Sequence, residues 1–419
     1  MAERWPALLG IVVFLALAWA CSLDRRRFPW RIVLSGLALQ LAFALLILKT
    51  AAGRALFEGA QAVVTRLIGF ANEGARLVFG PLAQAETLER GFGPGNALIL
   101  AVTITATIIL IAALSALLYH WGVLQRVVAG FGWVMRRVMG TSGSESLAAA
   151  ANIFMGQTEA PLVVQPYLKG MTRSELMALM TGGMATIAGG VGAVYASLGV
   201  AAGEPNMAGH LLTASVMNAP AALLVAKIML PETALSATAG GASARVERTT
   251  RNAVDALCAG AGDGLKLALN VLAMLIAFTA VVALANFLLG LVLQPLTGRV
   301  LTLQQLLGWV NAPLAWLMGV PAHDAVLVGQ FLGERIILNE FVGFLSLTGQ
   351  RESLDSRSFV IATYALCGFA NFASIAIQIG GIGALEPARR ADLSDLGLRA
   401  MLGGLLACYL TACLAGLLV

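Results

Sequence analysis

Charged residues are scarce in this chain of 419 residues. They make up 12% of it, whereas 59% of the residues are hydrophobic and the mean hydropathy is +0.84. Soluble globular domains carry about 25% charged residues. The shortage of charge excludes an ordinary soluble fold and predicts an all-α, polytopic membrane protein.

Residue types that perform catalysis or bind metals are also few. The three histidines, His120, His210 and His323, are scattered, and the five cysteines have no metal-ligand spacing. No nucleophile and base form an arrangement for covalent catalysis. Gly260-Ala-Gly-Asp263 has the G-x-G-D form of an intramembrane aspartyl protease, but no second aspartate falls inside an expected span to share a proton with Asp263. We therefore expect no enzyme, and a proton relay through a histidine, best placed at His323, stays an alternative.

Eight hydrophobic runs approach or exceed the roughly 17 to 25 residues that a membrane-spanning helix needs. The first could be mistaken for a cleaved signal, but Trp19 is too bulky for the cleavage pattern, and we interpret the run as a helix. The sequence thus predicts eight transmembrane helices, within residues 7–23, 32–48, 97–118, 176–202, 210–229, 265–293, 359–385 and 400–419.

The formal net charge of +5 reports membrane topology and not nucleic-acid binding, because the basic residues lie between hydrophobic runs and form no single stripe. When the loop with Arg25, Arg26, Arg27 and Arg31 is placed in the cytoplasm, most of the 27 Lys and Arg residues fall on the cytoplasmic side. This asymmetry follows the positive-inside rule. We expect an inner (cytoplasmic) membrane protein with both termini on the outer side.

Two further stretches, 142–167 and 311–347, are apolar at both ends but broken by polar residues, glycine and proline in the middle. Each predicts two short helices that meet at a tip, a re-entrant hairpin. Non-helical backbone at membrane depth persists only where protein or a water-filled cavity satisfies it, so each tip should point at a site. Each hairpin also carries a carboxylate, Glu159 or Glu340, that we expect to be buried. An ionisable group kept inside a membrane indicates function.

Each hairpin is followed by a long helix with its own polar, glycine-containing cluster, at 181–190 and 368–374. Corresponding interrupted segments in two halves are typical of transporters with inverted repeats and a central site. A passive channel would instead present a ring of like side chains along a continuous pore. The pattern predicts an alternating-access carrier.

At these residues the chain resembles the concentrative nucleoside transporters. The resemblance implies the bacterial short form of that family: a homotrimer in the lipid bilayer with eight spans, in which a transport domain moves against a scaffold in an elevator-type motion. The matching motifs run in order from about 142 to 385: Ser142-Gly-Ser-Glu-Ser-Leu-Ala, Ala151-Asn-Ile-Phe-Met-Gly-Gln-Thr-Glu-Ala-Pro161, Met171-Thr-Arg-Ser-Glu-Leu176, Thr181-Gly-Gly-Met-Ala-Thr186, Ala312-Pro-Leu-Ala-Trp-Leu-Met-Gly-Val-Pro321, Asn339-Glu-Phe-Val342, Cys367-Gly-Phe-Ala-Asn-Phe372 and Ile377-Gln-Ile-Gly-Gly-Ile382.

Composition and resemblance together predict six parts. Residues 1–140 hold N-terminal helices of the scaffold and, at 54–90, an amphipathic helix that lies in the membrane interface. Residues 141–230 form the first hairpin repeat, 231–264 a cytoplasmic linker, 265–300 a scaffold helix, 301–390 the second hairpin repeat, and 391–419 the C-terminal helix.

The resemblance also implies the substrate and the residues that bind it. A uridine-like nucleoside would contact the first half through its base and the second half through its ribose. The chemistry fits, because the ribose hydroxyls can donate to a carboxylate and the base edge alternates donors and acceptors. The base would be held by Gly156, Gln157, Thr158, Glu159 and Val191, and the ribose by Glu340, Asn371 and Ser374, with Phe369 nearby.

Sodium is the coupling ion that the resemblance implies, with no other cofactor. Its ligands would be the side chains of Asn152 and Thr186 and the backbone carbonyls of Met155 and Ile187, and proton-coupled symport is the alternative.

Structural roles stay open for several of these residues. Glu159 could pair with Lys169, and Glu340 with Arg335, which otherwise braces the hairpin. Asn152, Asn371 and Ser374 could join helices by hydrogen bonds.

Overall fold

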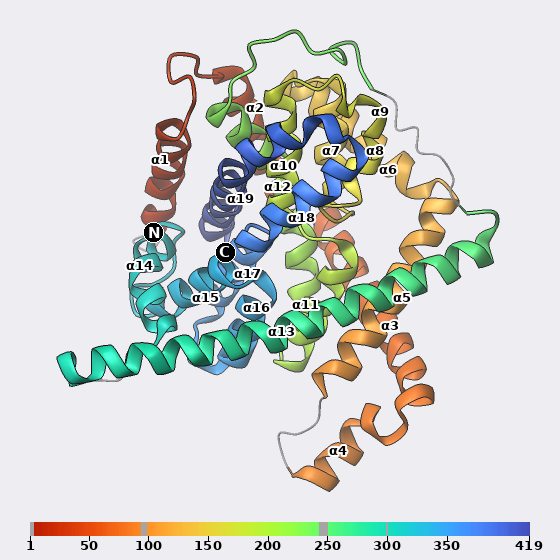
Figure 1. Ribbon diagram of the computed structural model, residues 1–419, viewed down its shortest axis with the longest axis vertical. Coiled ribbons are helices and arrows are strands. Elements are labelled where there is room, and N and C mark those ends of the chain that lie inside the picture. The colour runs from red at the N-terminus through yellow and green to blue at the C-terminus, as the bar shows by residue number, and fades with distance from the viewer. Residues whose placement is uncertain (1–3, 94–98, 243–249, 299–300) are drawn as a thin grey trace.

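The computed structural model describes residues 4–93, 99–242, 250–298 and 301–419. All regular elements in these ranges are helices, which confirms the predicted all-α class (Figure 1). Six helices or helix pairs are long and apolar enough to cross a membrane. They are α2 (Trp30–Lys49), α5 (Leu100–His120), the pair α10 (Arg173–Ala185) and α11 (Gly189–Ala201), α12 (Met207–Met229), α13 (Ala253–Thr297) and α19 (Arg390–Leu418).

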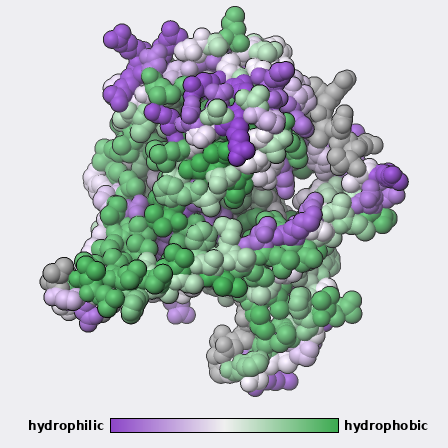
Figure 2. All heavy atoms as spheres, viewed as in Figure 1, coloured by the Kyte–Doolittle hydropathy of each residue, from purple (hydrophilic) through white to green (hydrophobic). Residues whose placement is uncertain are grey.

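The two remaining expected spans are occupied by shorter apolar segments. The first is α1 (Trp5–Ala20), and the second is the pair α17 (Ser356–Leu366) and α18 (Phe372–Leu385). Each of the eight predicted runs therefore contains a helix or a broken helix. Figure 2 shows polar side chains gathered at the end of the molecule where the loop after α1 and the loop after α12 lie, with apolar side chains covering the region around α13.

The first hairpin consists of one regular arm and one irregular arm. The regular arm is α7 (Gly143–Asn152), which begins with a capping box in which Ser142 and Glu145 satisfy each other's backbone N–H groups. The returning arm is split into α8 (Ala160–Val163) and α9 (Gln165–Leu168). Each of these turns has a proline in its first two positions, where proline favours a helix start over continuation.

The second hairpin region holds the predicted pair of helices that meet at a tip, and its predicted range, 311–347, also includes the end of a third helix that precedes them. The three helices are α14 (Leu303–Leu317), α15 (Ala325–Ile337) and α16 (Glu340–Gly349), and the tip lies at Leu338 and Asn339. Helix α14 packs closely along α15, and a Cβ on Gly329 would lie 2.5 Å from the carbonyl oxygen of Gly308. Asn339 starts α16 because its side chain accepts a hydrogen bond from the backbone N–H of Val342.

The two broken helices cross at their breaks. A Cβ on Gly368 would lie 2.7 Å from the carbonyl oxygens of both Met184 and Ala185, so only glycine permits this approach. Asn218 of α12 joins the two breaks, because its amide nitrogen donates to the carbonyls of Ala185 at 2.7 Å and Cys367 at 2.8 Å. Protein thereby satisfies non-helical backbone carbonyls at both breaks.

Two boundaries differ from those expected. Helix α13 begins at Ala253 and not at 265, because Asn252 caps it through a hydrogen bond from the N–H of Asp255. The linker expected over 231–264 therefore ends at 252, and its residues 243–249 lie outside the described ranges.

Helices α3 (Ala51–Phe79) and α4 (Ala85–Phe92), joined by the turn η1 (Gly80–Ala83), cover the expected amphipathic region, and α6 (Val123–Met139) completes the N-terminal part.

Candidate functional site

A cavity of about 210 Å³ lies where the two hairpin tips meet the breaks of α10–α11 and α17–α18. Residues from α13 complete its wall. The structure brings together every residue that was predicted to contact the substrate: Gly156, Gln157, Thr158, Glu159, Val191, Glu340, Phe369, Asn371 and Ser374.

Glu340, at the start of α16, has both carboxylate oxygens occupied by donors. Its Oε1 accepts from the hydroxyl of Tyr195 at 3.0 Å, and its Oε2 accepts from the side-chain nitrogen of Asn371 at 2.9 Å. The residue is 6% exposed. Such charge-assisted hydrogen bonds are roughly twice as strong as neutral ones, so the carboxylate is held in one orientation at the cavity wall.

Asn371 orients the carboxylate because it is itself held by the start of α18. Its side-chain oxygen accepts from the backbone N–H of Ser374 at 2.9 Å, which caps the helix and turns the amide nitrogen toward Glu340. Tyr195 is held on the other side by aromatic packing. Its ring stacks on Phe344 with a centroid distance of 4.3 Å and meets the edge of Phe341 at 5.7 Å.

Glu159, at the first hairpin tip, differs from the prediction that both carboxylates would be buried. It is exposed, and the one hydrogen bond that its side chain makes to described residues comes from the backbone N–H of Gly156 at 3.2 Å. Glu159 is accessible because it lines both the central cavity and a second cavity of about 710 Å³. Met155, Tyr119, Asp263 and others line the second cavity.

The first tip is tied to the second half of the chain through Gln157. Its amide nitrogen donates to the hydroxyl of Ser374 at 3.0 Å, and its amide oxygen accepts from Gln378 at 3.1 Å. Together with the Asn371 and Glu340 contacts, these bonds form one continuous polar chain along the cavity. Side chains from both repeats therefore build a single site.

The predicted sodium ligands gather beside the same tip. Asn152 is fully buried at the end of α7, and neither polar atom of its side chain has a hydrogen-bond partner among the described residues. An unsatisfied buried amide costs about 1 to 3 kcal/mol, which a bound ligand would offset. Thr186 lies at the break of α10–α11 and donates to the carbonyl of Gly182 at 2.9 Å, so its oxygen lone pairs can still accept a cation.

Two backbone carbonyls complete that predicted sodium site. Met155 and Ile187 are both buried, and the adjacent residues join the tip to the break, because the N–H of Gly189 donates to the carbonyl of Phe154 at 3.1 Å. A set made only of oxygen ligands fits a hard cation.

Neither alternative ion pair is formed among the described residues. Buried Arg335 donates instead to the carbonyl of Ala365 and to the sulfur of Cys408, and no salt bridge joins it to Glu340. None joins Glu159 to Lys169 within the described chain. Arg335 therefore links α15 to the end of α17 and to α19, which agrees with the structural role expected for it.

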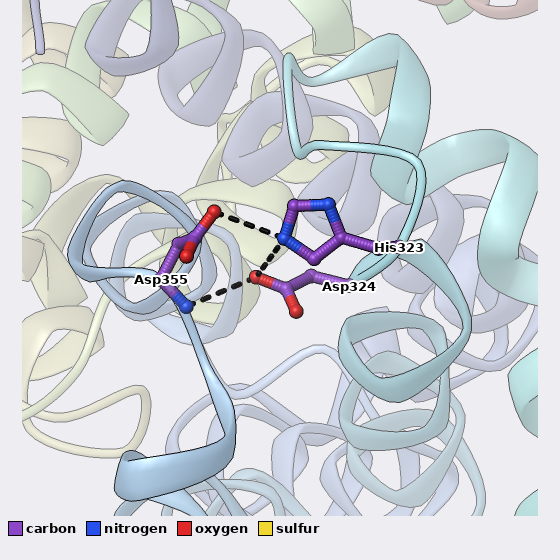
Figure 3. A group of neighbouring side chains, drawn as sticks. All are labelled: His323, Asp324 and Asp355. Carbon is purple, nitrogen blue, oxygen red and sulfur yellow. Dashed lines mark hydrogen bonds and ion pairs between the residues drawn. The ribbon is translucent and has the colours of Figure 1, made fainter.

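A group of titratable side chains lies apart from the cavity (Figure 3). Nε2 of His323 lies 3.0 Å from Oδ2 of Asp355 and 3.7 Å from Oδ2 of Asp324, and the backbone N–H of Asp355 donates to Asp324 at 3.1 Å. These contacts tie the start of α15 to the start of α17. His323 is exposed, and no histidine is among the described residues that line the central cavity, so the geometry gives a proton relay through His323 no support.

Sequence reasoning missed Tyr195 as a site residue. It lies within an apolar run, where an aromatic residue is indistinguishable from the core. One signal could have identified it: Tyr195 follows Val191 by four residues, so both fall on the same face of α11. Asn339, Phe341 and the α13 residues Leu267, Val271, Met274 and Leu275 also line the cavity without having been predicted.

Three segments of the chain match known families. Residues 9–82 and 210–416 match the families described as Na+ dependent nucleoside transporter N-terminus and C-terminus, and residues 101–202 match the one described as Gate: Nucleoside recognition. The chain is 38% identical to the nucleoside permease NupC of Helicobacter pylori over 99% of its own length and 97% of that protein.

Solved structures of a protein called CNTnw share the fold. One, in an inward-facing substrate-bound state, is 37% identical, with a TM-score of 0.91 over 99% of this chain and 98% of that one. A variant in an outward-facing state is 36% identical, with a TM-score of 0.93 over 100% and 98%. The polar cavity between two hairpins, the matches along the sequence and this likeness agree: the chain belongs to the concentrative nucleoside transporter family, whose members are not enzymes.

Proposed function

We propose that the protein imports nucleosides by symport with sodium and that its transport domain moves in an elevator-type, alternating-access cycle. The observation that carries this proposal is the cavity between the hairpin tips. Glu340, a carboxylate fixed by two hydrogen bonds, lines one side of this cavity, and the amide of Gln157 and the carboxylate of Glu159 line it from the opposite tip. A ring compound with hydroxyls at one end and a polar edge at the other complements this wall.

The ribose would lie against the second half. Glu340 is restricted to accepting, because a carboxylate has no hydrogen to donate, so two neighbouring hydroxyls of a sugar are suitable partners. Asn371 and Ser374 supply further polar atoms, and Phe369 supplies apolar surface. The base would lie against Gly156, Gln157, Thr158, Glu159 and Val191.

Sodium would bind at Asn152, Thr186 and the carbonyls of Met155 and Ile187. The unpartnered amide of Asn152 supports this placement, and so does the family description, which names sodium dependence. Asn152 and the substrate-contacting residues 156–159 belong to one hairpin tip, so an ion that orders the tip would raise the affinity for the nucleoside. By linkage the nucleoside raises the affinity for sodium by the same factor.

The remaining assignments rest on the family resemblance and on the distribution of basic residues. We propose that the two hairpin repeats form the transport domain and that α13, with the N-terminal helices, belongs to the scaffold of a homotrimer in the inner membrane, with both termini outside. Large apolar side chains such as Ile276, Phe287 and Val292 are exposed along α13 and suit contact with lipid or another subunit.

Uptake by the purified protein in sealed vesicles tests the proposal. A sodium gradient imposed alone is expected to drive accumulation of radiolabelled uridine, and a sodium ionophore is expected to abolish it. Accumulation that follows an imposed pH gradient and ignores sodium would assign proton coupling instead. Equilibration without accumulation under either gradient would contradict the symport proposal.

A further inference from the structure

A buried glutamine outside the cavity contacts an amide that lines it. Gln378 is 0% exposed on α18 and is not among the described residues that line the central cavity. Its amide nitrogen donates twice, to the backbone carbonyl of Met180 at 3.1 Å and to the amide oxygen of Gln157 at 3.1 Å. A polar side chain kept inside a membrane-spanning segment indicates a role beyond packing.

The donors and acceptors around Gln378 determine which way its amide and the amide of Gln157 are turned. A backbone carbonyl can only accept, so Gln378 must turn its NH₂ group toward Met180. The second hydrogen of the same NH₂ group points at Gln157, which must then present its oxygen there. The nitrogen of Gln157 consequently faces the other way, 3.0 Å from the hydroxyl of Ser374 and at the cavity wall.

Close packing keeps the two amides together. A Cβ on Gly183 of α10 would lie 2.7 Å from the nitrogen of Gln378 and 3.0 Å from Cβ of Gln157, so the glycine leaves room for both side chains. The hydroxyl of Ser374 accepts from Gln157 and keeps its own hydrogen to donate. The deep part of the base end therefore offers the N–H of Gln157 as a donor, and the carboxylate of Glu159 nearer the second cavity offers acceptors.

We infer that Gln378 is a positioning residue which fixes Gln157 as a hydrogen-bond donor toward the substrate, so that the site favours a nucleobase with a carbonyl over one with an amino group at its projecting exocyclic position. This inference rests on the proposed nucleoside transport. Gln157 is buried whereas Glu159 is exposed, so the group that projects farthest from the ring is the one that reaches the recessed donor.

Uridine and cytidine differ at that position. The uracil carbonyl accepts from Gln157, and its neighbouring ring N–H can donate to Glu159. In cytosine an amino group opposes the N–H of Gln157, and a ring nitrogen that accepts opposes the carboxylate. Sites that leave a buried polar group unpaired with the wrong ligand discriminate strongly, and one unpaired neutral group corresponds to about tenfold in affinity.

Two substitutions of Gln378 separate positioning from packing. Gln378→Leu removes the constraint, so the amide of Gln157 can turn either way and the preference for uridine should fall from about tenfold toward equality. Gln378→Glu should reverse it. A carboxyl buried there stays neutral, donates its O–H to Met180 and accepts from the nitrogen of Gln157, which turns the oxygen of Gln157 toward the cavity. Ile379→Leu, one residue further along α18, is the matched control.

The measurement is competition by unlabelled uridine and cytidine against uridine uptake in proteoliposomes, together with the sodium concentration for half-maximal uptake. The expected result is a changed ratio of the two inhibition constants, with the sodium value and the control unchanged. A ratio within twofold of wild type in both Gln378 variants, or a wild type that does not prefer uridine, would overturn the inference. No sodium-driven uptake of any nucleoside by the wild type would overturn the proposed function instead.

Discussion

The two carboxylates of the site occupy opposite kinds of surroundings. Glu340 in the second half is buried and receives hydrogen bonds from Tyr195 and Asn371, whereas Glu159 in the first half is exposed and receives one from its own tip. The local sequences gave no sign of this difference, since each carboxylate follows an apolar stretch and one or two polar residues.

The contrast indicates a division of tasks. A side chain that is already fixed before the ligand arrives loses little conformational entropy on binding. The second half is therefore suited to strong binding of the proposed ribose with little rearrangement. The first half borders the larger cavity and holds its carboxylate with fewer contacts. It is suited to opening and closing around the base. The following experiments would sharpen this contrast or remove it, beginning with the largest expected effect.

Glu340→Gln should lower uridine uptake efficiency by about 100-fold, because an amide replaces a charge and turns one donor toward Tyr195 or Asn371. Initial rates over a range of uridine concentrations in proteoliposomes would measure it. Glu334→Gln is the control: Glu334 is a buried carboxylate of the same hairpin, accepts from Gln330 at 3.2 Å, and does not line either described cavity. Equal uptake in wild type and Glu340→Gln would remove Glu340 from the ribose site.

Asn152→Ala should raise the sodium concentration for half-maximal uptake by about tenfold or more, since it removes one oxygen ligand at the first tip. Asn311→Ala is the comparison variant, because Asn311 is a buried amide on α14 that donates only within its own helix among the described residues. A sodium curve that stays the same in Asn152→Ala would place the ion elsewhere.

Tyr195→Phe should weaken uridine binding by about five- to tenfold, because one oxygen of Glu340 loses its donor while the ring keeps its packing. Isothermal titration with uridine in detergent measures the change. Tyr364→Phe serves as its counterpart, since Tyr364 is equally buried and its hydroxyl lies 3.4 Å from His210, away from the cavity. Equal affinities in the two variants would show that Glu340 does not depend on Tyr195.

Glu159→Gln should have the smallest effect, about two- to fivefold on the concentration for half-maximal uptake, because solvent already competes for this exposed carboxylate. The same uptake assay applies. A loss as large as that in Glu340→Gln would abolish the contrast between the halves and show that the first tip closes over Glu159 when substrate is bound.

The architecture was predictable where hydrophobic length and helix-breaking residues decide it. The runs of apolar residues located each span, and the glycine and polar clusters at 181–190 and 368–374 contain both helix breaks. Boundaries decided by a single cap were not predictable. Asn252 starts α13 well before its apolar stretch. Gly319, Pro321 and His323 marked a break, but nothing in the sequence showed that it separates α14 from α15 and is not the hairpin tip.

The site was predictable where polar residues stand out against an apolar background, as Gln157, Glu340 and Asn371 do. Tyr195 was missed because its hydroxyl is one atom on a residue that suits the core. Gln378 was quoted within a motif but given no role, because only the fold shows that it faces Gln157 across 221 residues of sequence. The exposure of Glu159 depends on where the second cavity opens, which no local pattern encodes.

Asn218 donates to the backbone carbonyls of both interrupted helices at once, so it joins the two helix breaks beside the binding site. In the proposed elevator-type motion, the two breaks would therefore move together as one unit. Relative movement would then occur between the proposed transport domain and the proposed scaffold. Substitutions that change the turnover rate without changing the affinity for the nucleoside should therefore lie at the boundary between these two proposed parts and not in the binding cavity.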